Sequence, residues 1–278
     1  MSVESIYRWQ GGELVPLEYC DMSDTSIEVA DSWFVTNGTV LALGLHRDRF
    51  LGSLPADVRA ETGADAFWDA ALALIPREGD WFPRVELQRR SGAHSLVFRH
   101  RSSPRRTNNL VEVTWQGRDP RTVPAIKGPD LEALTRVRTI AQGSGAAEAV
   151  IVTGDGYIVE DSHGGLAWWR GEILCTPPRE FDRVDSVTVR SLLALATALG
   201  VETYEESVTP AEIAETELWS LNALHGIRIV TRWVDGPPLA QLPGRLALWR
   251  ARMDALRKPI PAASNPATAM EDSGKRSG

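Results

Sequence analysis

A polar connection with two prolines, residues 117 to 125, is the feature that most constrains how this chain folds. It reads Gly-Arg-Asp-Pro-Arg-Thr-Val-Pro-Ala, and a stretch so poor in apolar residues and so rich in turn formers is typical of a domain boundary. Strand-like and helix-like patterns occur on both sides of it. We therefore predict a smaller N-terminal domain over 1–120 and a larger C-terminal domain over 121–258.

The N-terminal half is expected to be mostly strands. Asn37-Gly38 lies between two β-forming runs, 33–36 and 40–45, which is a strong short-range signal for a hairpin. The other elements expected here are strands at 5–9, 14–17, 83–88, 95–101 and 110–115 and a helix at 66–75 that stops at Pro76.

The C-terminal half has a different period. Helical spacing of apolar residues predicts a helix over 131–142, directly after Lys127, and a strongly apolar helix over 189–199 that follows Val187-Thr188. The other elements expected are four short strands in a meander at 149–153, 157–160, 166–169 and 173–175, strands at 201–208, 218–221 and 227–233, a short helix at 210–215 and a last helix at 241–257. Residues 259–278 are too poor in apolar side chains to fold and are predicted to be a disordered tail.

Composition excludes several classes of protein. The net charge is −7 and the pI is near 5.4, which argues against nucleic acid or an anionic membrane as the main partner. Only Cys20 and Cys175 are present and the five histidines are scattered, so no disulfide scaffold and no metal site are predicted. With no apolar segment of membrane-spanning length and no signal-like N-terminus, we expect a soluble cytoplasmic protein.

Lys127 is the only lysine before residue 258. Of the 30 lysines and arginines, three are lysines, so the chain meets its need for surface cations with guanidinium groups that keep their protons. A lone lysine is then present for its amine, which can form a Schiff base with a carbonyl. The competing explanation is that a coding bias favours arginine and that Lys127 is an ordinary loop residue.

A lysine that binds the carbonyl of pyridoxal phosphate needs an anion cradle, an acid for the ring nitrogen and walls for the ring. The helix start at Val187-Thr188 offers unpaired N–H groups for a phosphate, Arg49 offers a bidentate contact and Glu160 offers the acid. Taken singly, Arg49 also fits a surface residue, Glu160 a solvated turn acid and Thr188 a helix cap.

In order and spacing, these segments resemble the class IV aminotransferase family, the fold type IV pyridoxal-phosphate enzymes. The resemblance covers residues 30 to 236. The segments that carry it are Leu45-His46-Arg47-Asp48-Arg49-Phe50-Leu51-Gly52-Ser53, Lys127, Ala147-Glu148-Ala149 to Glu160 with Gly156-Tyr157-Ile158-Val159-Glu160, Leu174-Cys175-Thr176-Pro177-Pro178, Val187-Thr188, Glu215-Thr216-Glu217, Asn222-Ala223-Leu224-His225-Gly226-Ile227 and Val234-Asp235-Gly236.

Some positions depart from the family pattern. The usual Asn-Leu-Phe is Gly165-Leu166-Ala167, the usual Gly-Ile-Thr-Arg is Ser186-Val187-Thr188-Val189, and the usual Gly-x-Phe-Glu-Thr is Ser32-Trp33-Phe34-Val35-Thr36. Where the family usually has an Asn shortly after the lysine, this chain has Asp130. These changes leave the predicted cofactor contacts in place and bear on substrate and turnover.

The resemblance implies an α/β (α+β) fold of two domains with the cofactor in the cleft between them, and a homodimer. It implies that Lys127 binds pyridoxal 5'-phosphate and then moves protons, with Arg49, Glu160, Val187, Thr188 and Ala223 as cofactor contacts. Within the family, Asn222-Ala223-Leu224 resembles the loop of 4-amino-4-deoxychorismate lyase, which releases pyruvate to give 4-aminobenzoate in the folate route. The alternatives are an amino-acid transaminase of the branched-chain or D-amino-acid type, acting on a small-molecule amine, and a relative that has lost turnover.

Overall fold

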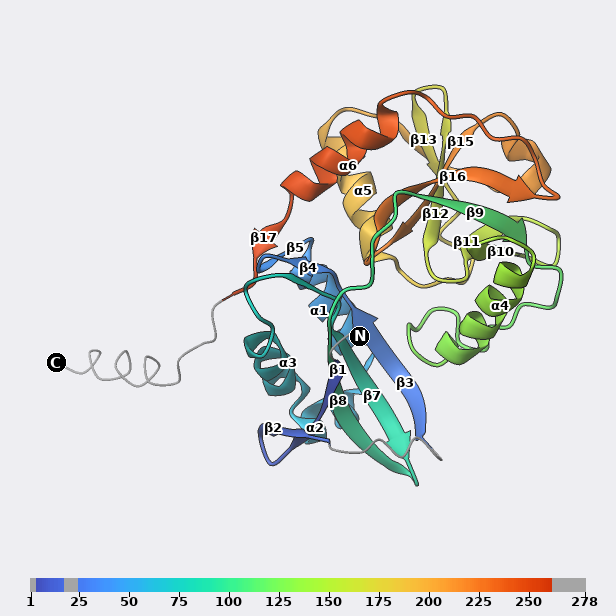
Figure 1. Ribbon diagram of the computed structural model, residues 1–278. Helices are drawn as coiled ribbons and strands as arrows, with labels where there is room; N and C mark the ends of the chain where they lie inside the picture. Colours follow the sequence, from blue (N-terminus) through green and yellow to red (C-terminus); the bar gives the residue numbers. More distant parts are fainter. Residues whose placement is uncertain (1–3, 18–24, 262–278) are drawn as a thin grey trace.

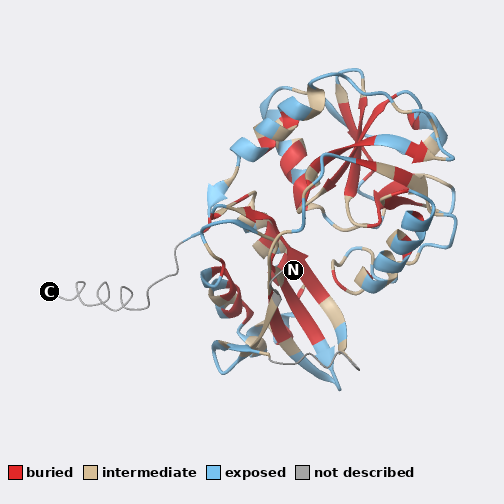
Figure 2. Ribbon diagram, in the orientation of Figure 1, coloured by how far each residue is buried: buried red, intermediate tan, exposed pale blue. Residues whose placement is uncertain are grey.

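The computed structural model describes residues 4–17 and 25–261, arranged in two lobes (Figure 1). Cys20 and most of the predicted tail lie outside the described residues. The strands of both lobes are largely buried, and the exposed residues gather on helices and loops (Figure 2). The mixed α/β architecture predicted from the sequence is confirmed by the fold.

The smaller lobe is built on a five-stranded antiparallel sheet. Its order is β2-β1-β8-β7-β3, formed by β1 (Glu4–Gln10), β2 (Glu13–Pro16), β3 (Thr25–Ser32), β7 (Arg84–Arg90) and β8 (Ala93–Arg101). One face of the sheet is covered by α1 (Leu43–Ser53), α2 (Ala56–Thr62) and α3 (Ala64–Ala73), whose apolar residues join Val29, Leu87 and Phe98 in one core. The strands predicted at 5–9 and 14–17 are present and pair as the hairpin β1–β2, and the helix predicted to stop at Pro76 is present as α3.

The strand predicted over 40–45 is too long. The Asn37-Gly38 turn is present between β4 (Val35–Thr36) and β5 (Thr39–Val40), but the chain leaves the sheet there and α1 begins at Leu43. Ala42 adopts the left-handed conformation, with φ 51°, and turns the chain into the helix. The apolar residues of 40–45 suggest one strand because the end of β5 and the start of α1 are both apolar and follow each other directly.

The larger lobe is built on an eight-stranded mixed sheet of order β11-β10-β9-β16-β15-β12-β13-β14. Its strands are β9 (Asn109–Thr114), β10 (Glu148–Val152), β11 (Ile158–Asp161), β12 (Gly165–Arg170), β13 (Ile173–Thr176), β14 (Thr203–Glu205), β15 (Glu217–Asn222) and β16 (Gly226–Val234). The predicted meander is corrected: β10–β11 and β12–β13 are two hairpins, separated in the sheet by three other strands. The strand predicted over 201–208 shrinks to three residues, because 206–208 leave the sheet.

Helices cover one face of this sheet. Alternation along the strands places Trp169, Trp219 and Ile229 under α5 (Val187–Ala198) and α6 (Arg245–Ala255), and Val111 and Val113 under α4 (Leu131–Gly143). The opposite face packs with the 3₁₀ helix η1 (Pro210–Ile213), which replaces the short helix predicted at 210–215. Figure 1 shows α4 beside β10 and the α5–α6 pair near the smaller lobe.

The chain changes sheets earlier than the predicted boundary. β9 pairs in parallel with both β10 and β16, so it belongs to the larger sheet although it precedes residues 117–125. The crossing therefore lies between β8 and β9. The polar segment at 117–125 instead leads from β9 back across the molecule toward Lys127.

The end of the chain returns to the smaller lobe. β17 (Lys258–Pro259) pairs with β5 in the sheet β17-β5-β4-β6, whose last strand is β6 (Asp80–Trp81). Ile260 is buried in the core of that lobe, and Arg77 donates to its carbonyl at 3.1 Å. The tail predicted to start at 259 is therefore ordered through residue 261.

Candidate active site

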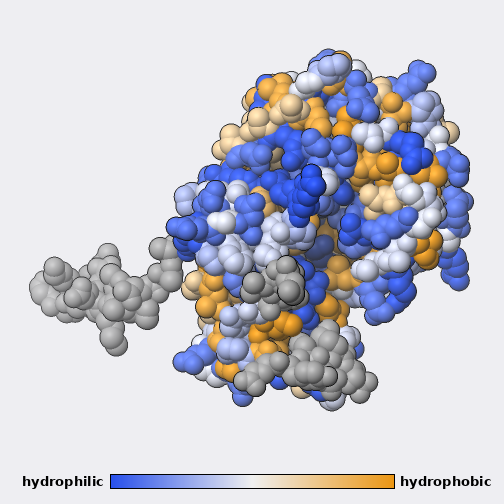
Figure 3. Space-filling model, viewed as in Figure 1, coloured by the Kyte–Doolittle hydropathy of each residue, from blue (hydrophilic) through white to orange (hydrophobic). Residues whose placement is uncertain are grey.

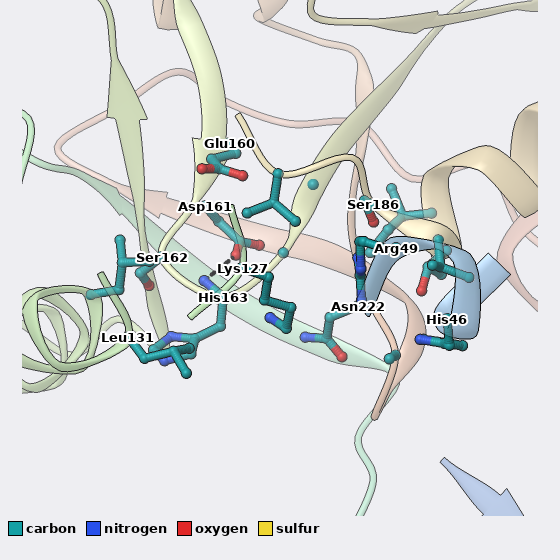
Figure 4. Close-up of a pocket in the computed structure, with 18 residues that line it drawn as sticks. His46, Arg49, Lys127, Leu131, Glu160, Asp161, Ser162, His163, Ser186 and Asn222 are labelled. Atoms are coloured by element: carbon teal, nitrogen blue, oxygen red, sulfur yellow. Dashed lines mark hydrogen bonds between the residues drawn. The ribbon is translucent and has the colours of Figure 1, made fainter. Parts of the chain in front are cut away.

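All six residues predicted for the site line one cavity. It holds about 570 Å³ of empty space, open solvent at its mouth included. It lies where α1 of the smaller lobe meets one end of the larger sheet. The lining residues named in Figure 4 come from α1 (His46, Arg49), the loop before α4 (Lys127), α4 itself (Leu131), the β11–β12 hairpin (Glu160, Asp161, Ser162, His163), the start of α5 (Ser186) and the end of β15 (Asn222).

Lys127 is held in the cavity by its own backbone. Its carbonyl accepts a hydrogen bond from Ala30 N of β3 at 2.6 Å. Gly128 follows with φ +145°, and a Cβ there would stand 2.8 Å from Val29 Cα, so only glycine allows so close an approach. The loop that carries the lysine is thus pressed against the neighbouring lobe.

Asp130 fixes the other end of this loop. Its carboxylate accepts from Thr122 N at 2.8 Å, from Thr122 Oγ1 at 2.8 Å and from Val123 N at 2.9 Å. Aspartate at this position, where the family has Asn, therefore ties the polar segment to the start of α4. The departure has a structural role close to Lys127.

The amine of Lys127 is prepared to lose its proton. Burial, and next the positive charge of Arg49, lower the pKa of Lys127 to about 8, although Asp31 and Glu160 oppose the shift. A larger fraction of the amine is then neutral and nucleophilic near pH 7 than for an ordinary lysine.

Arg49 and Glu160 lie on opposite sides of Lys127 (Figure 4). Arg49 is anchored by Asp31 of β3, with Nε 2.7 Å from Oδ2 and Nη2 2.9 Å from Oδ1, and its Nη1 donates to Asp185 O at 3.0 Å. His46 Nδ1 lies 2.7 Å from the same Asp31 Oδ1. Asp31 is fully buried. Its carboxylate, the guanidinium of Arg49 and the ring of His46 therefore form one hydrogen-bonded group at the cavity wall.

The start of α5 forms the wall beside Arg49. The helix begins at Val187, two residues earlier than predicted, because Ser186 is the N-cap and its Oγ accepts from Val189 N at 3.3 Å. Val187 and Thr188 line the cavity with the first turn, whose N–H groups have no partner within the helix. A Cβ on Gly165 would stand 2.7 Å from Val189 Cγ2, so glycine there lets this turn approach β12.

Glu160 lies at the far side, on β11, opposite Ile151 of β10. Burial raises the pKa of Glu160 to about 7, against the opposing charge and hydrogen bond of Arg121. Arg121 Nη1 donates to Glu160 Oε1 at 2.5 Å. Arg121 comes from the polar segment and was not predicted as part of the site.

The turn after Glu160 adds a second group that can exchange protons. His163 lines the cavity and its Nδ1 lies 3.1 Å from Oε2 of Glu148, which also accepts from Ser162 Oγ at 2.6 Å. Burial would raise the pKa of Glu148, but the hydrogen bond and charge of His163 and other partners outweigh it and lower that pKa to about 2. Glu148 is therefore an anion that orients the imidazole.

Buried charges lie beneath this turn. Asp161 Oδ2 accepts from Ser220 Oγ at 2.5 Å, and Ser220 Oγ accepts from Arg228 Nη2 at 3.1 Å. Burial and then the nearby charge of Glu148 raise the pKa of Asp161 to about 6. At the remaining edge, Asn222 Oδ1 accepts from His225 N at 2.8 Å and shapes the turn that brings Ala223 to the cavity.

The structure therefore brings Arg49, Lys127, Glu160, Val187-Thr188 and Ala223 together, and their roles toward a cofactor stay predictions. Sequence reasoning missed their supports, which are Asp31, His46, Arg121, Glu148 and His163. His46 and Glu148 stand inside segments that carry the resemblance and His163 follows Glu160 by three residues, so their places in the sequence were the available signal. Asp31 and Arg121 had no such signal, because they are common residue types that long-range contacts bring to the site.

Metal and membrane sites find no support in the described parts of the chain. Within 4–17 and 25–261, no set of three or more His, Cys, Asp or Glu side chains is grouped to bind a metal ion. No helix in those residues combines the length and the apolar character needed to cross a bilayer. The face seen in Figure 3 mixes hydrophilic and hydrophobic residues.

Comparisons with known proteins agree with the family resemblance seen in the sequence. The family model described as "Amino-transferase class IV" matches residues 28–233. A hypothetical aminotransferase from Mycobacterium tuberculosis in a PLP-bound form superposes with a TM-score of 0.71 at 19% identity, covering 91% of this chain and 98% of that one. A search of curated proteins finds no match.

Two further solved structures share the fold. A branched-chain aminotransferase from Thermoproteus uzoniensis, solved with norvaline, has a TM-score of 0.74 at 18% identity and covers 92% of this chain and 99% of that one. A fold IV transaminase from Curtobacterium pusillum has a TM-score of 0.69 at 17% identity, covering 91% and 96% of the two chains. At these identities the likeness establishes the fold.

Proposed function

The chain belongs to the class IV aminotransferase family and is a pyridoxal-phosphate-dependent enzyme, and we propose that its reaction is that of a 4-amino-4-deoxychorismate lyase. In this reaction the substrate ring loses one C–H proton and its enolpyruvyl group, and the departing group takes up a proton to become pyruvate. The observation that carries the proposal is the pair of proton-exchanging groups, Lys127 and His163, on one cavity.

The cavity residues fit the cofactor. Arg49 and the first turn of α5 supply N–H donors and positive charge at one side, which suits a phosphate. Glu160 supplies an acid at the other side, and Lys127 lies between them. Because Gly165 has no Cβ, the first turn of α5 can approach β12 closely. Once bound through Lys127, pyridoxal phosphate acts as an electron sink for a carbanion next to the amine nitrogen.

Lys127 has two tasks in this proposal. Its neutral amine would hold the cofactor through the cofactor's carbonyl, and once the substrate amine is bound there instead, the same Lys127 amine would take a proton from the substrate carbon. A pKa of about 8 keeps the amine able both to accept and to return a proton near neutral pH. The loop around Gly128 keeps it at a fixed place during both tasks.

His163 supports the lyase reaction in particular. Both reactions move one proton, but transamination moves it between the two carbons that flank the amine nitrogen, whereas the lyase reaction delivers it to the departing enolpyruvyl group, so a second proton donor on the cavity favours the lyase. With Nδ1–H donating to Glu148, Nε2 of His163 is left to exchange that proton.

Transamination of amino acids is the second candidate. It is supported by the names of the superposable structures, which include branched-chain aminotransferases. A catalytically impaired relative is the third, motivated by the departures at Gly165, Ser186 and Val189. The predicted homodimer and cytoplasmic location also stay proposals, and light scattering on the purified protein tests the first.

The experiment supplies purified holoenzyme with 4-amino-4-deoxychorismate and, separately, with amino acids plus 2-oxo acids. We expect 4-aminobenzoate and pyruvate in equal amounts, and about 100-fold slower release in His163→Gln. The matched control is His94→Gln, since His94 Nε2 pairs with Glu28 Oε2 at 2.9 Å on the surface of the other lobe. New amino acids without 4-aminobenzoate would establish the transaminase instead, and no product from either mixture would leave the impaired relative.

A further inference from the structure

Arg121 lies between two acids at the Glu160 side of the cavity. Its Nη1 donates to Glu160 Oε1 at 2.5 Å, while its Nε lies 2.9 Å from Asp119 Oδ1 and its Nη2 2.6 Å from Asp119 Oδ2. Only 4% of the Arg121 side chain and 8% of the Glu160 side chain are exposed, whereas the Asp119 side chain is 38% exposed. One guanidinium is thus shared between a buried acid and a half-exposed one.

The position of Arg121 is fixed from several directions. Nη1 also donates to Asp182 O at 3.0 Å, in the loop before α5. The next two residues, Thr122 and Val123, donate to Asp130 at the start of α4. The polar segment therefore holds the guanidinium rigidly against Glu160, and one carboxylate oxygen of Glu160 is engaged by it.

The bond matters because Glu160 is the acid expected to face the cofactor's ring nitrogen. An acid partner keeps that nitrogen protonated and deepens the electron sink, whereas a cationic partner leaves it neutral. In this protein the acid, Glu160, is itself hydrogen-bonded to a cation, Arg121. The other charged groups that face Glu160 are Lys127 from its loop, Asp161 from the same strand and Arg183 from the loop after β13.

We propose that Arg121 is a positioning residue that fixes the Glu160 carboxylate through Oε1 and weakens its hold on the proton of the cofactor's ring nitrogen. Asp119 limits this effect, because it neutralises part of the charge of Arg121 from the other side. The pair Asp119–Arg121 then sets how strongly the ring withdraws electrons. This inference rests on the proposed function only in requiring that pyridoxal phosphate bind at Lys127.

The two supports of Glu160 give opposite predictions. Arg121→Gln removes the cation, so the ring nitrogen should bind its proton at least about tenfold more tightly. Asp119→Asn releases the whole charge of Arg121 toward Glu160, so the ring nitrogen should bind its proton less tightly. Arg121→Lys keeps a positive charge and should stay closer to the wild type than Arg121→Gln. A residue that only anchored the loop would not produce opposite shifts.

The measurement is an NMR titration of holoenzyme loaded with pyridoxal phosphate isotopically labelled at the ring nitrogen, whose chemical shift reports its protonation directly. A midpoint that moves up in Arg121→Gln and down in Asp119→Asn supports the proposal. Unchanged midpoints, or shifts in the same direction, overturn it. If Arg121→Gln does not fold, Asp119→Asn and Arg121→Lys decide alone, and a midpoint unchanged in both overturns the proposal. Failure of the wild type to bind the cofactor covalently refutes the proposed function instead.

Discussion

Replacing Asp31 by Asn measures how much the buried group of Asp31, Arg49 and His46 contributes to stability. Asp31 is fully buried and accepts two hydrogen bonds from Arg49, while His46 Nδ1 lies 2.7 Å from its Oδ1. Removal of one partner from a buried ion pair destabilises a protein by about 3–5 kcal/mol. We expect the lower end, about 3 kcal/mol, because Arg49 keeps its bond to Asp185 O and 12% of its side chain is exposed.

The effect should depend on pH in a defined way. Burial alone would raise the pKa of Asp31, but Arg49 and His46 outweigh it and hold that pKa well below its ordinary value. A carboxyl group with a depressed folded-state pKa stabilises the fold above its unfolded-state pKa of about 3.9 and loses that contribution as the pH falls further. The difference between wild type and variant should therefore be constant from about pH 5 upward and shrink below about pH 4.

Urea unfolding of the apoprotein, followed by tryptophan fluorescence across this pH range, measures the difference in free energy of unfolding. The matched control is Asp65→Asn, which also removes an acid held by two arginines, Arg47 and Arg59, but on the surface, with 48% of the Asp65 side chain exposed. It should change the free energy of unfolding far less. Equal losses in the two variants, or a loss in Asp31→Asn that persists at low pH, would refute the reasoning.

Three further changes test the rest of the framework. Lys127→Ala should abolish borohydride trapping of pyridoxal phosphate, and in the wild-type apoprotein the rate of Schiff-base formation with added pyridoxal phosphate, followed by absorbance, should rise with pH up to about 8 as the amine becomes neutral. Gly128→Ala should reduce cofactor binding and thermal stability, because its Cβ would meet the backbone of the other lobe 2.8 Å away, whereas Gly143→Ala, with nothing within 4 Å, should leave both unharmed. Ile260→Ala should lower the free energy of unfolding by about 2–5 kcal/mol, measurable in urea, because the side chain is buried in the core of the smaller lobe.

Most helices and strands could be predicted from the periodicity of apolar residues, and the residues that line the cavity could be predicted from the order of the motifs. The Asn37-Gly38 turn, the helix before Pro76 and the helix after Lys127 are each fixed by neighbours in the chain, so local patterns predicted them. The order of strands in the larger sheet was not predictable in this way. β9 pairs with β16, more than a hundred residues later, and alternation along a strand does not say which strand lies beside it.

The supports of the site were out of reach for a related reason. Asp31 lies 18 residues before Arg49, and Arg121 lies 39 residues before Glu160. Acids and arginines are common on any surface, so neither pair stands out in a chain with 27 arginines. What identifies them is burial, which only the folded structure supplies. The family motifs contain the residues that would contact a cofactor, such as Arg49 and Glu160. Asp31 and Arg121, which hydrogen-bond to those two residues, lie outside the motifs.

Two of the departures from the family pattern prove to be a single structural feature. Gly165 stands where the family has Asn, and Val189 stands where it has Arg; in the structure a Cβ on residue 165 would lie 2.7 Å from Val189 Cγ2. A larger side chain at 165 would have to push the first turn of α5 away from β12, while the glycine lets Val189 fill that space. Ser186, the third departure, caps the same turn. Glycine at 165 and valine at 189 replace polar side chains and let α5 approach β12, while Ser186 adds a hydroxyl that is used to cap the turn. Of the three residues, Gly165 and Ser186 line the cavity.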